Sequence, residues 1–192
     1  MTKLEQAIQK IDALNAQDPN LEKDGEQEVP KELLYSQRMT QHLFAFEPDA
    51  SESLQVAARA QHICRWKRPR EDYPMTRVGY LKWREELKKM HAQVTGDLLE
   101  FLDYEKEFID RVQFLIKKKR IKKDQESQTL EDVICLVFLS YYFEDFAAKH
   151  ETDKVIDIVQ KTWAKMSEKG QEAALKLPLS ATTLDLVGKA LA

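Results

Sequence analysis

Three ionisable side chains fall in segments whose apolar pattern predicts burial: His62, His91 and Asp132. A buried ionisable group needs a partner, because burial without one is strongly unfavourable. Two neutral imidazoles and a carboxylate suit a divalent metal ion, which can activate water or neutralise a phosphate. His62 and His91 flank a loop, so antiparallel helices would present both rings to one site. We therefore expect these three residues to bind a metal such as Mn, Fe, Zn, Ni or Mg.

Each of the three residues also has a purely structural explanation. A buried histidine such as His62 commonly donates to a backbone carbonyl. His91 follows two lysines and would then be a solvated residue at a helix boundary. Asp132 follows Thr129 by three positions, which is the spacing of a capping box with Asp in place of Glu. The residue pattern leaves both interpretations open.

Arginine and aromatic residues gather around His62 and predict a phosphate site. Guanidinium groups match phosphate oxygens, and aromatic faces accept nucleobases. The expected substrate-binding residues lie in the loop after His62 and on three helices: Arg38, Arg59, Arg65, Trp66, Arg68, Tyr80 and Arg84. A loop held by ion pairs to Glu71 and Asp72 would account for the loop arginines without any ligand.

The densest basic run is Lys117 to Lys123, in which six of the seven residues are cationic. Such a run is typical of a nucleic-acid or acidic-surface contact, and equally of a solvated helix end whose cations complement the helix dipole. No glycine-rich phosphate loop, CxxC pair, GxSxG elbow or HExxH motif is present. The sequence therefore gives no support for the enzyme classes that depend on these motifs.

The composition favours helices, and the charge balance excludes the overall positive charge of a general nucleic-acid binder. The chain of 192 residues is 43% hydrophobic and 33% charged, with only 5 Gly and 6 Pro, which suits long helices with charged outer faces. Its 30 basic and 33 acidic side chains give a formal charge of −3, so any anion site must be local. No apolar run of roughly 18 residues is present, and both cysteines lie in apolar helical contexts. We expect a cytoplasmic protein with no membrane partner.

Helical periodicity predicts an all-α fold of about seven to nine helices. We expect one domain over residues 1–192, in which segments 1–20 and 150–192 pack on a central core of residues 30–148. An acidic loop is expected over 21–29, and Gly96 is expected to bend or interrupt its helix. The expected helices cover residues 2–16, 30–46, 51–66, 78–94, 108–116, 129–148, 152–163, 171–176 and 180–191. The oligomeric state stays open.

Five segments carry a resemblance to a known family. They are YSQRM (35–39), AARAQHICRWKRPREDYP (57–74), GYLKWREELKKMHA (79–92), LEDVICLVFLSYYFEDFA (130–147) and KTWAKMS (161–167). Together they resemble the domain-of-unknown-function 4202 family over nearly the whole chain. That resemblance implies no established reaction.

A more distant similarity is to the HD phosphohydrolase superfamily and implies an HD-like helical bundle. His62 would match the first His of that metal site, His91 the His of the His-Asp pair, and Asp132 the final Asp. Ala92 stands where the paired Asp is expected. The resemblance thus implies either a metal-dependent phosphohydrolase with a degenerate site or a descendant that binds the ligand without turnover.

The expected ligand is a phosphorylated small molecule or nucleotide. The alternative is a non-catalytic helical adaptor or RNA-associated protein that uses Lys117 to Lys123 and the loop from Arg65 to Arg70 as its contact surface. The two functions differ in their salt dependence, because a nucleic-acid contact made by several lysines weakens steeply as salt is added.

Overall fold

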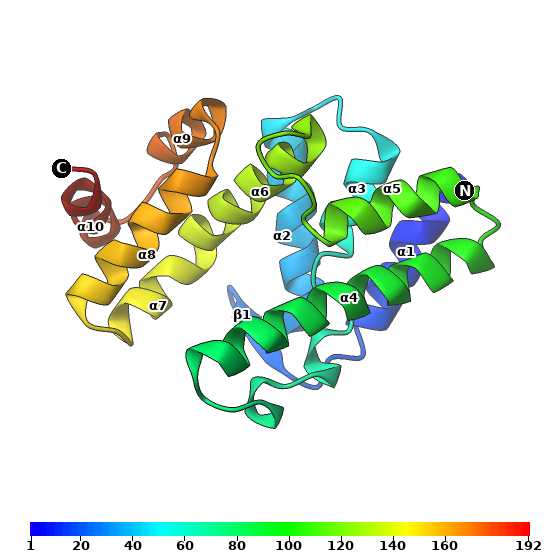
Figure 1. Cartoon of the computed structure of the whole chain (residues 1–192), viewed down its shortest axis with the longest axis horizontal. Helices are drawn as coiled ribbons and strands as arrows, with labels where there is room; N and C mark the ends of the chain where they lie inside the picture. The colour runs from blue at the N-terminus through cyan, green and yellow to red at the C-terminus, as the bar shows by residue number, and fades with distance from the viewer. The chain divides into compact units, whose positions relative to one another are not determined.

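A computed structural model describes all 192 residues and confirms the all-α prediction. It contains ten α-helices and a single hairpin, rather than seven to nine helices (Figure 1). No helix is both long enough and apolar enough to cross a bilayer. The helices are α1 (Lys3–Asn15), α2 (Lys31–Phe46), α3 (Glu52–Arg59), α4 (Arg77–Phe101), α5 (Lys106–Ile116), α6 (Gln125–Val137), α7 (Phe143–Ala148), α8 (Thr152–Lys165), α9 (Glu168–Leu175) and α10 (Ala181–Leu191).

The chain forms two compact units, each with its own core. Unit 1 contains Met1–Phe44 and Pro48–Lys119, and unit 2 contains Ala45–Glu47 and Arg120–Ala192. The single domain expected from the sequence stays a prediction.

In unit 1, α1, α3, α4 and α5 pack around a common apolar core. Helix α1 begins at a capping box, in which Thr2 and Glu5 satisfy each other's backbone N–H groups. Its apolar stripe then buries Ala7 and Ile11 completely. Helix α4 contributes Leu87 and Leu99, so each helix presents one apolar face to the core, as the 3.6-residue period requires.

Helix α3 ends seven residues earlier than the periodicity predicts. Cys64 has a φ of 55°, in the left-handed region that a regular helix excludes, and the chain turns there. Two short 3₁₀ turns follow, at Arg65–Lys67 and Arg70–Asp72. The indole N–H of Trp83 on α4 donates to the Arg68 carbonyl at 2.9 Å and holds this loop against α4.

Residues 21–30 form a hairpin, so the prediction of an acidic loop there was wrong. Strands β1 (Leu21–Asp24) and β2 (Gln27–Pro30) pair antiparallel, with Asp24 opposite Gln27. Gly25 has a φ of 63°, which a tight turn between the strands needs and which Gly adopts without strain. The hairpin is attached to α2, because Glu22 on β1 forms an ion pair with Arg38 on α2.

Gly96 does not interrupt α4, which runs unbroken from Arg77 to Phe101. A Cβ on Gly96 would lie 2.1 Å from the side-chain nitrogen of Gln113 on α5. Gln113 in turn donates to the Ala92 carbonyl at 3.0 Å. Gly96 therefore allows α4 and α5 to approach each other closely, and it does not bend α4.

Unit 2 is built around α6 and the segment that continues it. The buried apolar helix predicted over 129–148 is present, but it begins at Gln125, where Asp124 caps the first turn. A π-helical turn at Phe138–Tyr142 joins α6 to α7. The core of the unit gathers side chains from α6, the π-helical turn and α7–α10, among them Leu136, Leu139, Phe143, Val155, Val159, Ala174 and Val187.

Asp132 lies in the interior of α6, so the capping box expected with Thr129 was wrong. Its carboxylate instead reaches the start of α9, where it accepts from the Ser167 backbone N–H at 2.8 Å and from the Ser167 hydroxyl at 2.5 Å. Gly170 on α9 faces this carboxylate directly. Asp132 thus joins α6 to the N-terminus of α9, where a negative charge is also favoured by the helix dipole.

Gly170→Ala should destabilise unit 2 although alanine has the higher helix propensity. The added Cβ would lie 2.5 Å from Asp132 Oδ1 and 2.6 Å from its Cγ, so α9 or Asp132 must shift. We expect a loss of about 1–3 kcal/mol in the free energy of unfolding, the usual cost of overpacking, measured by urea denaturation.

Gly188→Ala is the matched control. A Cβ on Gly188 in α10 meets no atom within 4 Å, so this substitution should be neutral or stabilise by up to about 1 kcal/mol. Equal effects of the two substitutions would contradict the packing of Gly170 against Asp132.

Candidate functional site

His62, His91 and Glu32 meet in unit 1 from three separate segments. His62 follows the end of α3, His91 lies in the middle of α4 and Glu32 is in the first turn of α2. The two imidazole rings have centroids 6.0 Å apart, and Tyr35 stacks on the His62 ring at 3.9 Å with an interplanar angle of 11°. The two histidine rings lie close together as expected, although His62 stands in the turn after α3 and not on a helix.

The His62 ring is held between a carboxylate and a guanidinium. Its Nδ1 lies 3.2 Å from Glu32 Oε2, and its Nε2 lies 2.9 Å from Arg65 Nη1. Because a guanidinium can only donate, Nε2 is the acceptor in the neutral ring. The ring proton then lies on Nδ1 and is donated to Glu32.

His91 is buried and makes the contact that the sequence suggested for His62. It is 3% exposed, so it is not a solvated boundary residue. Its Nδ1 lies 2.7 Å from the Ile63 carbonyl oxygen, and a carbonyl can only accept. Burial, with a smaller contribution from His62, lowers the pKa of His91 to about 3. His91 is therefore neutral over the physiological range.

The surroundings of His62 are strongly cationic. Burial lowers the pKa of His62 well below 6.5, and the charges of Arg65, Lys118, Arg84 and Lys31 act in the same direction. Burial raises the pKa of the neighbouring Glu32, which Arg65 and Lys31 oppose. Glu32 is thus the one carboxylate in contact with a ring on which four cations act, and the site has an excess of positive charge.

Three of the predicted ligand-binding arginines are occupied by carboxylates. Arg59 is a bidentate partner of Asp12, with both nitrogen to oxygen distances 2.7 Å. Arg38 pairs with Glu22 and lies near Asp24. Arg68 donates to Glu86 at 3.1 Å and to the Tyr73 hydroxyl at 3.2 Å. Ion pairs of this kind explain the arginines without a ligand. The loop carboxylates expected to do so, Glu71 and Asp72, are not among the partners in these pairs.

Arg65 and Arg84 differ from these three. Arg65 contacts the neutral His62, with Glu32 no closer than 3.8 Å to its Nε, and its guanidinium lies 5.0 Å from the Trp83 ring centroid. Arg84 donates to the Tyr80 hydroxyl at 3.2 Å, which is a neutral acceptor. The side chains of His62 and Arg65 are 26% and 27% exposed, so a solute can reach them.

Of the two aromatic residues expected in the ligand site, Trp66 and Tyr80, the Tyr80 ring already lies within 6 Å of Arg70 and Arg84. The Trp83 ring, which was not among the expected residues, lies within 6 Å of both Arg65 and Arg70. Trp66 is half-buried in the first 3₁₀ turn. The rings therefore hold the guanidinium groups in position, which leaves the N–H groups as the recognition element.

Asp132 belongs to unit 2, whereas His62 and His91 belong to unit 1. Its carboxylate accepts three hydrogen bonds, two from Ser167 and one from Gln128 at 3.1 Å. No group of three or more His, Cys, Asp or Glu side chains comes together as a metal-binding set. Since Arg65 also engages His62 Nε2, the residues gathered here do not fit a divalent metal centre.

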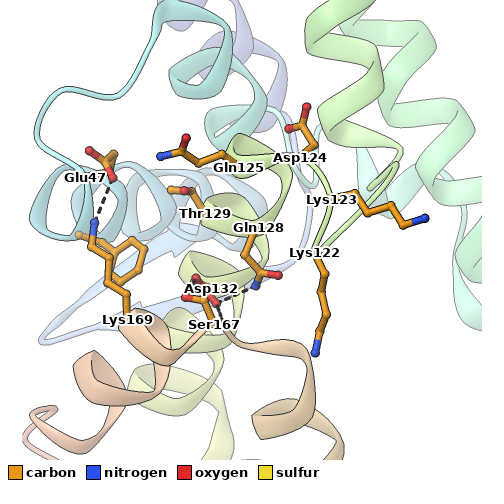
Figure 2. Close-up of a pocket in the computed structure, with 11 residues that line it drawn as sticks. Glu47, Lys122, Lys123, Asp124, Gln125, Gln128, Thr129, Asp132, Ser167 and Lys169 are labelled. Carbon is orange, nitrogen blue, oxygen red and sulfur yellow. Dashed lines mark hydrogen bonds and ion pairs between the residues drawn. The ribbon is translucent and has the colours of Figure 1, made fainter.

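Unit 2 contains a cavity of about 400 Å³ between the start of α6, the start of α9 and Phe46. Figure 2 shows Asp132 at Ser167, Lys169 reaching Glu47, and Lys122 and Lys123 extending away from Asp132. Lys122 donates to the Ala164 carbonyl at the end of α8. Of the lysines that line the cavity, Lys169 is the one with a carboxylate partner, Glu47.

Four residues of the His62 site were missed by the sequence reasoning: Lys31, Glu32, Tyr35 and Lys118. Glu32 and Tyr35 are three residues apart, on one face of α2. A carboxylate among apolar neighbours in a first helical turn was the available signal. Nothing in the sequence pattern indicated that α2 would lie beside His62.

The family model described as Domain of unknown function (DUF4202) matches residues 5–187. No curated protein and no solved structure matches the chain. The likeness to HD phosphohydrolases therefore stays a prediction.

The His91 environment predicts an acid-sensitive fold. In the unfolded chain a histidine titrates near pH 6.5, whereas folded His91 has a pKa of about 3. Stability is therefore complete above pH 6.5 and falls as the pH drops toward 3, because only the unfolded state takes up the proton. For this one residue the slope is about 1.4 kcal/mol per pH unit.

His91→Asn should reduce that slope, since asparagine can still donate to the Ile63 carbonyl but does not titrate. Urea denaturation of both proteins between pH 7 and pH 4 measures the difference. Parallel stability curves for the two proteins would contradict the burial of a neutral His91.

Proposed function

The chain belongs to the family described as Domain of unknown function (DUF4202), and we propose that its unit 1 binds a phosphorylated small molecule or nucleotide beside His62. The observation that carries this proposal is the charge imbalance around that ring. Four cations act on His62, and Glu32 is the only carboxylate that contacts it. A ligand phosphate with two negative charges would neutralise the excess positive charge around His62.

Arg65 and Arg84 are the residues we propose to contact the phosphate. Arginine favours such a ligand, because its planar fork matches two phosphate oxygens. Arg38, Arg59 and Arg68 are paired with Asp or Glu, so these three are less available to a ligand. Lys31 and Lys118 add long-range attraction at the rim of the site.

Catalysis is not part of this proposal. A general base at His62 would use Nε2, and that nitrogen accepts from Arg65 at 2.9 Å. A general acid would need a protonated imidazole, and both histidines have lowered pKa values. The donor set does not fit a metal. Binding without turnover, as in a metabolite sensor, requires none of these groups.

The second candidate is an RNA-associated adaptor in the cytoplasm that uses the basic run from Lys117 to Lys123. Its support is that this run follows the end of α5 as a non-helical segment, with positive φ at Lys118, Arg120 and Lys122. Such a contact, together with the loop from Arg65 to Arg70, would weaken steeply with salt, and Arg84, which lies outside both segments, would matter little.

Inorganic pyrophosphate is the probe for the first proposal, with binding measured by isothermal titration calorimetry. Arg84→Gln and Arg65→Gln should each weaken binding about tenfold or more, because a charge-assisted hydrogen bond contributes roughly 1.5–3 kcal/mol. Arg68→Gln, in the same loop but paired with Glu86, should change the affinity by less than about twofold.

Equal losses in all three variants would mean that pyrophosphate responds to general surface charge, and would remove the His62 site as its binding place. No binding of pyrophosphate or of a nucleoside diphosphate to the unmodified protein would overturn the proposal itself. Tight, salt-sensitive binding of single-stranded RNA in that case would favour the adaptor.

A further inference from the structure

The loop before α4 and the first turns of that helix expose three apolar side chains. Met75 is 78% exposed, Val78 is 77% exposed and Leu81 is 54% exposed. Val78 and Leu81 are three residues apart, on one face of the helix, and Met75 precedes them at the same spacing. We call these three side chains the apolar tip.

The apolar tip is held in a fixed conformation. Arg70 donates to the Tyr73 and Pro74 carbonyls at 3.0 and 2.9 Å, and Thr76 caps α4 through the Gly79 N–H. The Pro74 carbonyl packs so closely on Gly79 that a Cβ there would lie 2.0 Å from its oxygen. Exposure of the tip is therefore built into the fold, and no loose segment is involved.

The surroundings of the tip are basic although the whole chain is acidic. Between Pro74 and Arg84 there are three basic residues, Arg77, Lys82 and Arg84, and no acidic residue. From Arg65 to Arg84 there are seven basic residues against two acidic ones, whereas the complete chain has 30 against 33. Apolar side chains and cations are thus displayed on the same short stretch.

We propose that the apolar tip docks on an anionic membrane surface, with Met75, Val78 and Leu81 entering the lipid interface and the flanking cations contacting lipid phosphates. Protruding apolar groups ringed by cations are what peripheral binding to such a surface requires. The expectation of no membrane partner rested on the lack of a spanning segment, and surface docking needs none.

A protein partner suits the tip less well than a bilayer. A stable protein interface buries roughly 800 Å² on each partner, and three side chains on a protruding turn supply only part of that area. Lipid accepts a small apolar protrusion without a shaped pocket, and each nearby cation adds attraction to anionic headgroups. This proposal does not depend on the binding of a phosphorylated ligand beside His62.

Sedimentation with lipid vesicles tests the proposal. Vesicles of phosphatidylcholine with roughly a third phosphatidylserine should bind the full-length protein, and pure phosphatidylcholine should bind it at least about tenfold more weakly. The triple variant Met75→Ser, Val78→Ser, Leu81→Ser keeps the net charge and should lose about tenfold or more in vesicle affinity. Leu175→Ser, at a 61% exposed leucine in unit 2, should not change it.

A Val78→Trp variant gives a direct readout of insertion. The indole would leave water when the tip enters the lipid, so its fluorescence should shift to the blue with anionic vesicles and stay unchanged with neutral ones. Because all three positions are highly exposed, the substitutions remove little packing. Circular dichroism checks that the variants are folded.

Two outcomes would overturn membrane docking. One is that the unmodified protein fails to sediment with anionic vesicles at low salt. The other is that the triple serine variant sediments as well as the unmodified protein, in which case general charge attraction is sufficient. Arg65→Gln, at a residue outside the basic stretch from Pro74 to Arg84, separates this proposal from the preceding one, since it should weaken pyrophosphate binding and keep the indole shift of Val78→Trp.

Discussion

Two imidazole rings have centroids 6.0 Å apart in a site on which four cations act, and burial together with those charges favours the neutral form of both rings. Burial imposes that condition on His91, whose Nδ1 is committed to the Ile63 carbonyl. The same contact ties the end of α3 to the middle of α4, so the neutral state of His91 and the approach of the two helices depend on each other. The placement of His62 and of the loop behind it follows from this contact.

The neutral state of the imidazoles also determines how far the charge of the nearby arginines is neutralised. Arg65 donates to a ring nitrogen and lies over Trp83, and its one carboxylate neighbour is Glu32, 3.8 Å from its Nε. Had Asp or Glu occupied the position of His62, Arg65 would be a structural ion pair like Arg59 with Asp12. The excess positive charge in unit 1 therefore arises because the His62 ring stays neutral. Neither the composition nor the net charge of the chain reveals this.

Sequence patterns were sufficient where a structure depends on neighbours along the chain, and they failed where it depends on contacts across it. The helical period located α1, α2 and the apolar α6, and the two-histidine pairing followed from consecutive helices. The hairpin at 21–30 was missed although Asp24-Gly25 is a favoured turn pair, because short polar strands show no apolar alternation. Asp132 was expected either at a metal site with His62 and His91 or at its own helix start, whereas its actual partner is Ser167, 35 residues further along.

The same distinction explains why the predicted set of binding arginines shrank from five to two. An arginine beside apolar residues looks the same in sequence whether its partner is a ligand or a carboxylate from another helix. Asp12 and Glu22 come from elements far from Arg59 and Arg38 in the chain, so those pairs could not be read from local spacing. A binding function is therefore best sought at cations such as Arg65 and Arg84, whose closest hydrogen-bond partners are neutral groups and whose charge an anionic ligand could still compensate.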